Sequence, residues 1–261
     1  MVFGGFDSFI EEVFPSLLCL RDARYDVIAF DGPGQGATLE DANLPMHPDW
    51  DRPVTAVLDH FNLDDVTLLG ISLGGCLTMR AAAKEPRVTR VICDDVLVDF
   101  YAVLVRQFPA TLRRALRWLL NARSSALVNA LVGALMGNSL VLEWGVKQGM
   151  HVTGTSSPYA FLRESMRYEA TSISSDVTQD VLVMAGAEDH YVPVNQLTQQ
   201  VNLLTNARSV TARLFTRGEQ AQNHVHVGNL RLSLDVMLNW LEGLELRKLN
   251  TATGTRGQIQ G

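Results

Sequence analysis

Short apolar runs, rich in β-branched residues, alternate with segments of helical periodicity along most of this chain. The runs are nearly continuous in apolar residues, which is typical of strands that helices cover on both faces. The alternation therefore predicts an α/β fold with a doubly wound, mostly parallel sheet. The expected strands are Tyr25–Phe30, Val66–Ile71, Val88–Cys93, Val181–Ala185 and Ser209–Phe215, and the expected helices are Ser8–Leu18, Val54–Phe61, Gly74–Lys84, Val194–Leu204 and Leu230–Leu244.

A long segment from Asp99 to Thr171 interrupts this alternation. It has helical spacing throughout, with turns marked by Pro109, Gly137 and Pro158. At roughly 70 residues it far exceeds an ordinary connection between strands, although a long crossover is the simpler alternative. We therefore expect a helical cap over one edge of the sheet. The resulting division is residues 1–98 and 172–248 for the α/β core, 99–171 for the cap and 249–261 for a flexible tail with little apolar content.

The first residues, Met1-Val2-Phe3, look like the end of a strand, and a glycine turn follows at once. A sheet of this kind normally has strands before that point. We expect either that the first strands of the sheet are missing or that the sheet is smaller than usual.

The composition argues against several classes of protein. With 47% hydrophobic and 19% charged residues, the chain is expected to form an ordinary soluble globular domain. A net charge of −6 without a basic stripe argues against a nucleic-acid partner, and no apolar run approaches about 18 residues, so no membrane span is expected. Cys19, Cys76 and Cys93 lie in apolar surroundings and fit reduced core residues. Together with the lack of a basic-then-apolar leader, they favour a cytoplasmic protein, and a homodimer stays open as its assembly.

Ser72 is the strongest candidate for a nucleophile. It stands in the sequence Gly-Ile-Ser-Leu-Gly, between an expected strand and an expected helix. This Gly-x-Ser-x-Gly pattern at a strand-to-helix junction is typical of a nucleophile elbow, where the flanking Gly70 and Gly74 relieve a strained turn. The alternative, a serine that only makes the turn, does not need glycine on both sides.

A serine nucleophile needs a histidine base and an acid that orients it. In this architecture the chain order is serine, acid, histidine, so His47 and His60 come too early. His151 lies in the helical insertion, and His190 directly follows the candidate acid. His224 and His226, which follow the last strand, are the remaining candidates, with two exposed loop histidines as the alternative reading.

Asp189 is the favoured acid because it follows the strand Val181–Ala185. Glu188 is expected to point elsewhere. Asp94 and Asp95, which follow the strand before, are the alternative position for the acid. An aspartate that only caps a helix or a turn is the simpler reading of any of these residues.

Two glycine loops and one histidine pair complete the candidate features. The "FGGFD" loop precedes a helix, so a backbone N–H of Gly5 or Phe6 is expected to join that of Leu73 in an oxyanion hole, unless the loop is a plain turn. The "FDGPGQG" loop lacks the spacing of a dinucleotide site, so no cofactor is expected. His224 and His226 lack a full set of companion ligands, and no metal is expected.

Taken together, the motifs GGFDSFIEE, DGPGQG, GISLGG, GAEDHYVP and NHVHVGN resemble those of α/β-hydrolases over nearly the whole chain. Within that superfamily the chain is similar to the branch of FrsA-like proteins, 2,6-dihydroxypseudooxynicotine hydrolase and fungal polyketide-shortening hydrolases. The resemblance implies Ser-Asp-His hydrolysis of esters or of C–C bonds next to carbonyls. It also implies Ser72 as nucleophile, Asp189 as acid and His224 in preference to His226 as base. Members of this branch carry a partly helical region before the GGFDS motif, which is missing here.

The sequence thus predicts a cofactor-free serine hydrolase that forms an acyl-enzyme with a small acyl-bearing molecule. A peptidase or acyltransferase with the same triad is an alternative. A hydrolase-fold protein that only binds a ligand is the alternative from another class, since fold alone does not fix function.

Overall fold

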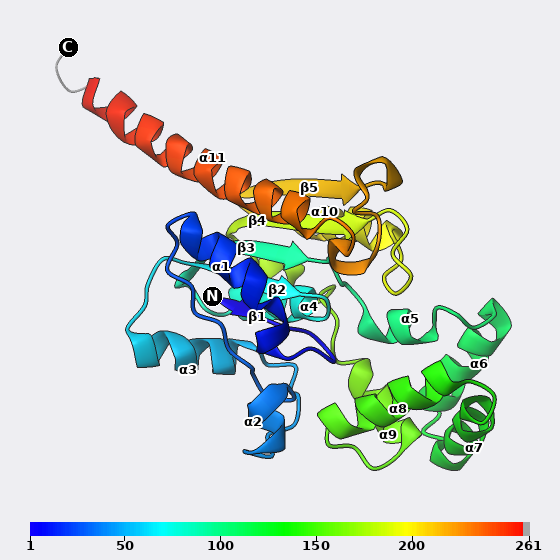
Figure 1. The fold of residues 1–261 in the computed structure, drawn as a ribbon. Helices are drawn as coiled ribbons and strands as arrows, with labels where there is room; N and C mark the ends of the chain where they lie inside the picture. The colour runs from blue at the N-terminus through cyan, green and yellow to red at the C-terminus, as the bar shows by residue number, and fades with distance from the viewer. Residues whose placement is uncertain (258–261) are drawn as a thin grey trace.

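A computed structural model describes residues 1–257 of the chain, with side chains through Asn250. Five parallel strands form one sheet in the order β1-β2-β3-β4-β5 (Figure 1). The strands are β1 (Val2–Phe3), β2 (Val66–Ile71), β3 (Val88–Asp94), β4 (Asp180–Gly186) and β5 (Ser209–Phe215). Each of the last four coincides with an expected strand to within one residue at either end.

Helices cover both faces of the sheet, as expected for a doubly wound fold. One face packs against α3 (Asp51–Phe61), α4 (Gly74–Ala82) and α10 (Asn195–Leu203), and the other against α1 (Phe14–Asp22) and α11 (Leu230–Gly257). Successive strand residues point to opposite faces, so Leu68 joins the first core and Leu69 the second. The prediction of a doubly wound α/β sheet is confirmed.

The expected strand Tyr25–Phe30 is wrong as a sheet strand. The segment runs extended beside β1 but forms only one isolated bridge, between Val2 and Ala29. The Val2 N–H donates to Ile28 O (2.8 Å) and the Phe30 N–H donates to Val2 O (3.1 Å). Because β1 is only two residues long, it offers no further ladder positions on that side.

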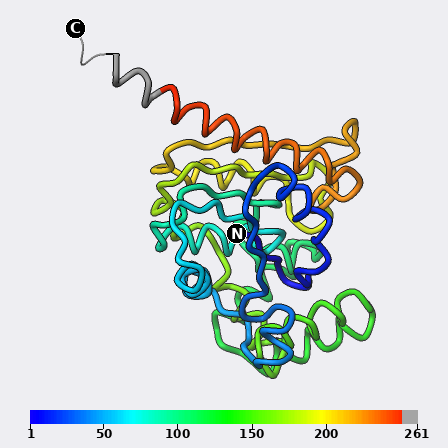
Figure 2. The backbone as a smooth tube through the Cα atoms, turned by 60° about the vertical axis from the view of Figure 1, so that its left-hand side comes forward, coloured from blue at the N-terminus to red at the C-terminus, as the bar shows by residue number. Residues whose placement is uncertain are grey.

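The segment between β3 and β4 is mostly helical. It contains α5 (Phe100–Val105), α6 (Ala110–Asn121), α7 (Ser125–Met136), α8 (Leu140–Val152) and α9 (Pro158–Ser165). Its two ends pair with each other, because Asp99 and Glu169 form an antiparallel bridge. In Figure 1 the strand arrows point toward the side of the molecule where these helices gather, and Figure 2 shows most of them together at the bottom of the view. We call this segment the helical insertion.

Several helix ends differ from the expected ones. α1 begins later than the expected helix Ser8–Leu18, because a 3-10 turn (Ile10–Val13) precedes Pro15. α2 (Gly36–Glu40) is a short helix that periodicity missed. α11 continues past Leu244 to Gly257, and so enters the expected tail 249–261, of which residues 258–261 lie outside the described residues.

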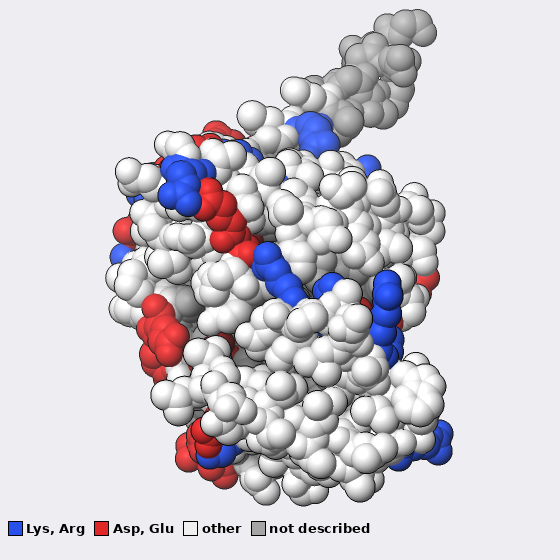
Figure 3. All heavy atoms as spheres, turned by 90° about the vertical axis from the view of Figure 1, so that its right-hand side faces the viewer, with Lys and Arg blue, Asp and Glu red and all other residues white. Residues whose placement is uncertain are grey.

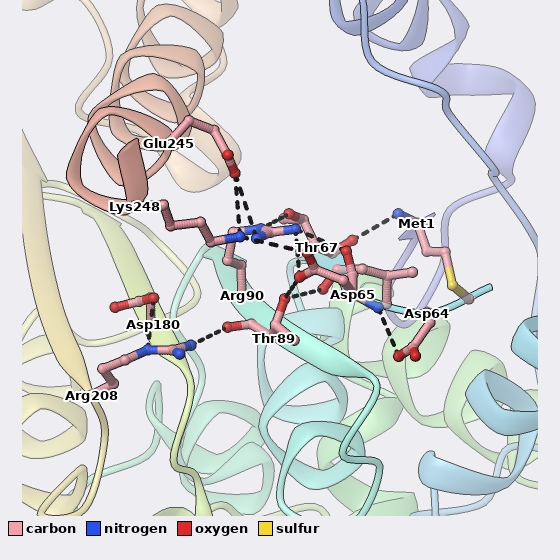
Figure 4. Close-up of polar contacts among 11 residues, drawn as sticks. Met1, Asp64, Asp65, Thr67, Thr89, Arg90, Asp180, Arg208, Glu245 and Lys248 are labelled. Carbon is pink, nitrogen blue, oxygen red and sulfur yellow. Dashed lines mark hydrogen bonds and ion pairs between the residues drawn. The ribbon is translucent and has the colours of Figure 1, made fainter. Parts of the chain in front are cut away.

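A polar network lies at the end of the sheet where the strands begin (Figure 4). The nearly buried Arg90 donates to Thr67 Oγ1 (2.8 Å) and lies 3.1 Å from Asp65 and 3.7 Å from Glu245 on α11. This network ties α11 to β2 and β3 at the end opposite the helical insertion.

Among the described helices, none combines the length and the apolar character that crossing a bilayer would require.

Candidate active site

Ser72 lies on a sharp turn between β2 and α4. Its φ of 59° is left-handed, a conformation that non-glycine residues adopt mainly under structural constraint. A Cβ on Gly70 would lie 2.1 Å from Gly74 O, and one on Gly74 would lie 2.8 Å from Gly4 O. The two glycines are thus required by close backbone approach, which is the reason expected for a nucleophile elbow.

The structure brings together the three residues that the sequence favoured. His224 Nε2 lies 2.8 Å from Ser72 Oγ, and His224 Nδ1 lies 2.7 Å from Asp189 Oδ2. The other Asp189 oxygen accepts the N–H groups of Tyr191 (2.6 Å) and Val192 (2.9 Å). The carboxylate is therefore fixed by its own loop, and its partner nitrogen on His224 must carry a hydrogen.

The environment favours an ionised Asp189 and a strongly basic His224. Burial alone would raise the pKa of Asp189, but the hydrogen bond and charge of His224 outweigh it and hold that pKa below its usual range. Burial alone would lower the pKa of His224, but its contacts with Asp189 and Asp95 outweigh it and hold that pKa above its usual range. A raised pKa makes the imidazole a better proton acceptor once it is neutral.

The alternative candidates occupy other positions. His226 is fully buried, with Nε2 at 3.0 Å from Asp94 Oδ1 and 3.3 Å from Asp95 Oδ1, whereas the imidazole in contact with Ser72 Oγ is that of His224. Asp95 also reaches the other histidine, since its Oδ2 lies 3.2 Å from His224 Nδ1. Glu188 pairs with Arg217 at the surface, as expected for a residue that points elsewhere.

The "FGGFD" loop lies against the elbow, but Gly5 does not offer a free donor. The Gly5 N–H donates to Ser8 Oγ (3.1 Å), which corrects its expected place in an oxyanion hole. Among the hydrogen bonds of the described residues, none uses the N–H of Phe6 or of Leu73. A Cβ on Gly5 would lie 2.8 Å from both Ile71 O and Leu73 N, so glycine is what allows this close approach.

Gln35 is a residue of the site region that the sequence analysis missed. It is almost fully buried, and its amide nitrogen donates to Gly4 O (2.8 Å) and Gly5 O (2.9 Å). Its amide oxygen accepts the Gly32 N–H (2.9 Å). The DGPGQG loop therefore braces the loop beside the elbow. The sequence analysis considered only the glycine spacing of the DGPGQG loop. The residues next to Gln35 in the sequence give no signal that its side chain binds carbonyls of another loop.

A cavity of about 770 Å³ opens beside Ser72 and His224. The helical insertion supplies much of its wall, including Leu104, Phe108, Val132 and Leu142, and most of the other wall is also apolar. The side chains with polar groups at the cavity are a minority: Asp7, Ser72, Arg106, Gln107, Trp144, His190, Tyr191 and His224. Figure 3, which faces this end of the molecule, shows the lower half as largely uncharged surface, with charged side chains at its lower corners. The cavity is suited to an apolar compound.

Two groups of side chains have ligand atoms close enough to surround a metal ion, Asp95-Asp189-His224 and Asp94-Asp95-His226. In both groups the shortest nitrogen–oxygen distances, 2.7 Å and 3.0 Å, are ordinary hydrogen-bond lengths. Ligands about 2.0–2.1 Å from a tetrahedral zinc ion would stand further apart. The distances therefore fit shared protons better than a shared cation.

Comparison with known proteins concerns the family and the fold of the chain. Residues 2–213 match the family model described as alpha/beta hydrolase fold. A hydrolase named acrC from Aspergillus aculeatus is 32% identical over 211 residues, which cover 76% of this chain and 48% of that protein. The 20-hydroxy-prefusarin hydrolase of Gibberella moniliformis is 33% identical over 171 residues, covering 61% of this chain and 40% of that one.

Among solved structures, 2,6-dihydroxy-pseudo-oxynicotine hydrolase matches with a TM-score of 0.64 and 22% identity, over 92% of this chain and 58% of that one. At this identity the likeness concerns the fold. The chain spans about half the length of the curated relatives that it matches.

Proposed function

Because the chain belongs to the α/β-hydrolase family, we propose that it is a cofactor-free serine hydrolase with Ser72 as nucleophile, His224 as base and Asp189 as acid. The observation that carries this proposal is the continuous contact from Asp189 through His224 to Ser72, at 2.7 and 2.8 Å. Both distances are within the range for proton transfer along hydrogen bonds.

In the proposed reaction, His224 Nε2 takes the Ser72 proton as Oγ attacks a substrate carbonyl carbon. The N–H groups of Phe6 and Leu73 stabilise the oxyanion, helped by the amino end of α4. His224 then gives its proton to the leaving group, and the bond from carbonyl carbon to leaving group breaks. Water, deprotonated by the same imidazole, hydrolyses the acyl-enzyme.

The bond cleaved would be an ester or a C–C bond next to a carbonyl. In the second case the leaving carbon must also lie next to a second carbonyl group, so that it departs as an enolate, which accepts the proton from His224. The apolar cavity supports a small or medium-sized acyl compound as substrate, with the helical insertion acting as a cap.

A fluorophosphonate probe tests this proposal without knowledge of the substrate. We expect the wild-type protein to be labelled at Ser72, as located by mass spectrometry of its peptides. The Ser72→Ala variant should remain unlabelled and should lose turnover of an activated ester by about 10⁶-fold. A folded wild-type protein that takes no label, or takes it on another residue, would contradict the proposal and favour a protein that only binds its ligand.

Replacing Gln35 should weaken the proposed oxyanion hole without touching the triad. Gln35→Leu leaves the buried carbonyls of Gly4 and Gly5 without their donor, which costs about 1–3 kcal/mol per unsatisfied group. We expect kcat for an activated ester to fall about 10- to 100-fold as the loop shifts, because displacements near 1 Å have effects of that size. Steady-state kinetics measure kcat, and an unchanged kcat in a folded Gln35→Leu variant would contradict the role of Gln35 in holding the loop.

The apolar cavity predicts a preference for longer acyl groups. Each CH₂ buried in it contributes about 0.8 kcal/mol, so kcat/KM for p-nitrophenyl esters should rise about fourfold per CH₂ until the cavity is filled. Gly145 lies at the cavity with open space around its Cβ position. Gly145→Phe would fill part of the cavity, so kcat/KM should stop rising at a shorter acyl chain than in the wild-type protein. Gly243→Phe, on α11, is the control because it also has open space. A flat chain-length profile would argue against an acyl site in this cavity.

A further inference from the structure

A second buried histidine–carboxylate cluster lies directly behind His224. It consists of Asp94, Asp95 and His226, whose exposed fractions are 7%, 1% and 0%. The turn that carries the two histidines is unusual, because Val225 has φ 45° and His226 has φ 57°. A β-branched residue in this left-handed region is a clear outlier, and such strain persists only where surrounding contacts impose it.

The contacts that impose this turn converge on Asp95. Its Oδ2 accepts the Val225 N–H at 2.7 Å and lies 3.2 Å from His224 Nδ1. Its Oδ1 lies 3.3 Å from His226 Nε2. Asp95 therefore bridges the two histidines, and the strained residue between them supplies the backbone donor that fixes the carboxylate.

The hydrogen positions in the cluster follow from its acceptors. His226 Nδ1 lies 3.2 Å from Ala221 O, and since a carbonyl cannot donate, Nδ1 must carry a hydrogen. Nε2 faces oxygens of Asp94 and Asp95, so a further proton must lie on Nε2 or on one of these carboxyls. When that proton lies on Nε2, His226 is an imidazolium that compensates the buried charge of Asp95.

We propose that Asp95, held by His226 and the Val225 N–H, is a second orienting carboxylate for His224 and can replace Asp189 in that task. This inference rests on the proposed function. Two carboxylates then share the Nδ1 hydrogen, with Asp189 nearer at 2.7 Å and Asp95 at 3.2 Å. Asp95 is a positioning residue, because it acts on the reaction only through His224.

The charge on Asp95 also affects the basicity of His224. Burial raises the pKa of Asp95 to about 6, so the carboxyl is mostly ionised in an assay at pH 7 to 8. The other ionisable or polar groups around His224 are Asp189, Asp7, His190, Tyr191, Ser72 and, through Asp95, His226. Asp95 and Asp189 are the two carboxylates that contact the ring directly.

Activity of the Asp189→Asn variant is the first test. Where a triad has a single orienting acid, its loss lowers kcat by about 10⁴-fold. We expect Asp189→Asn to lose only about 10²-fold in kcat for an activated ester, and Asp95→Asn/Asp189→Asn to lose about 10⁴-fold. A single variant that falls as far as the double variant would overturn the proposal. If Asp95→Asn does not fold, a loss of about 10⁴-fold in Asp189→Asn alone overturns it.

A titration of His224 is the second test and does not depend on turnover. His224 must be neutral to accept a proton, so kcat/KM should rise with pH as the imidazolium deprotonates. Asp95→Asn removes a negative charge beside Nδ1, which should lower the pKa of His224 by roughly 1 unit or more and move the rising limb to lower pH. NMR of ¹⁵N-labelled histidine measures this shift. Asp180→Asn, a nearly buried carboxylate where β4 begins, is the matched control and should leave the titration unchanged.

The outcomes separate the two proposals. If Ser72 takes no label while the pKa of His224 still falls in Asp95→Asn, the proposed hydrolase activity fails and the pairing of Asp95 with His224 stands. If Ser72 is labelled but the pKa does not move, the role of Asp95 fails alone. Metal analysis of the purified protein by mass spectrometry completes the test, since one equivalent of a transition metal that is lost in His226→Gln would replace this proposal by a metal site.

Discussion

His224→Ala is expected to lower kcat for an activated ester by about 10⁵- to 10⁶-fold, close to the effect of removing Ser72 itself. The physical reason is that His224 is the group within hydrogen-bond distance of Ser72 Oγ, at 2.8 Å, and is proposed to move the proton in both half-reactions. KM should change little, because most of the cavity wall that would hold an acyl group is unaltered. Burst and steady-state kinetics at pH 7 to 8 measure both quantities, after circular dichroism has shown that the variant is folded.

His60→Ala is the matched control for this variant. His60 lies on α3, is exposed, meets the ring of Phe61 edge-on and does not line the cavity. We expect its kcat to stay within about twofold of wild type, as is usual for exposed side chains away from the site. Activity of His224→Ala within tenfold of wild type would contradict the assignment of the base.

Local sequence patterns were sufficient to predict the elbow and its surroundings. The apolar run Val66–Ile71, the two glycines around Ser72 and the helical run after it each agree with the same strand-turn-helix unit, and the structure contains that unit. The chain order of serine, acid and histidine narrowed the base to His224 or His226, and the family resemblance favoured His224 with Asp189 as its acid. The structure brings these two residues into contact although 35 residues separate them. Patterns of this kind are readable because the backbone geometry demands particular residue types.

The features that the sequence did not predict depend on partners far along the chain. Tyr25–Phe30 has the composition of a strand, but a strand requires a neighbour, and β1 offers only Val2 as a bridging partner. The bracing role of Gln35 depends on carbonyls about 30 residues away. None of these pairings has a local signal, because they depend on tertiary packing.

The position of Asp95 also could not be predicted from the sequence. Asp94 and Asp95 were considered only as an alternative to Asp189 for the acid. The structure places Asp95 beside His224 together with Asp189, and against His226 as well. A sequence-based prediction that assigns one acid to one histidine cannot anticipate a carboxylate that contacts two histidines.

Gly5→Ala is expected to produce the second large loss of activity, through the backbone alone. An added Cβ would lie 2.8 Å from Ile71 O, 2.8 Å from Leu73 N and 3.0 Å from Ser72 Cβ. Backbone atoms cannot yield as a flexible side chain does, so the loop must move away from the elbow and carry the Phe6 N–H with it. Loss of one oxyanion donor typically lowers kcat by about 10²- to 10³-fold, and we expect a loss of that size in kcat for an activated ester.

Gly133→Ala is the control that separates this steric effect from the general effect of adding a methyl group. Gly133 lies within α7, and no atom of the described neighbours comes within 4 Å of its Cβ position, so the added methyl group causes no clash. Because alanine favours helix over glycine by about 1 kcal/mol, this variant should unfold at a slightly higher temperature and keep its kcat. If Gly5→Ala is folded and retains kcat within threefold, the loop does not supply the oxyanion donor, and a second donor must be sought elsewhere around Ser72.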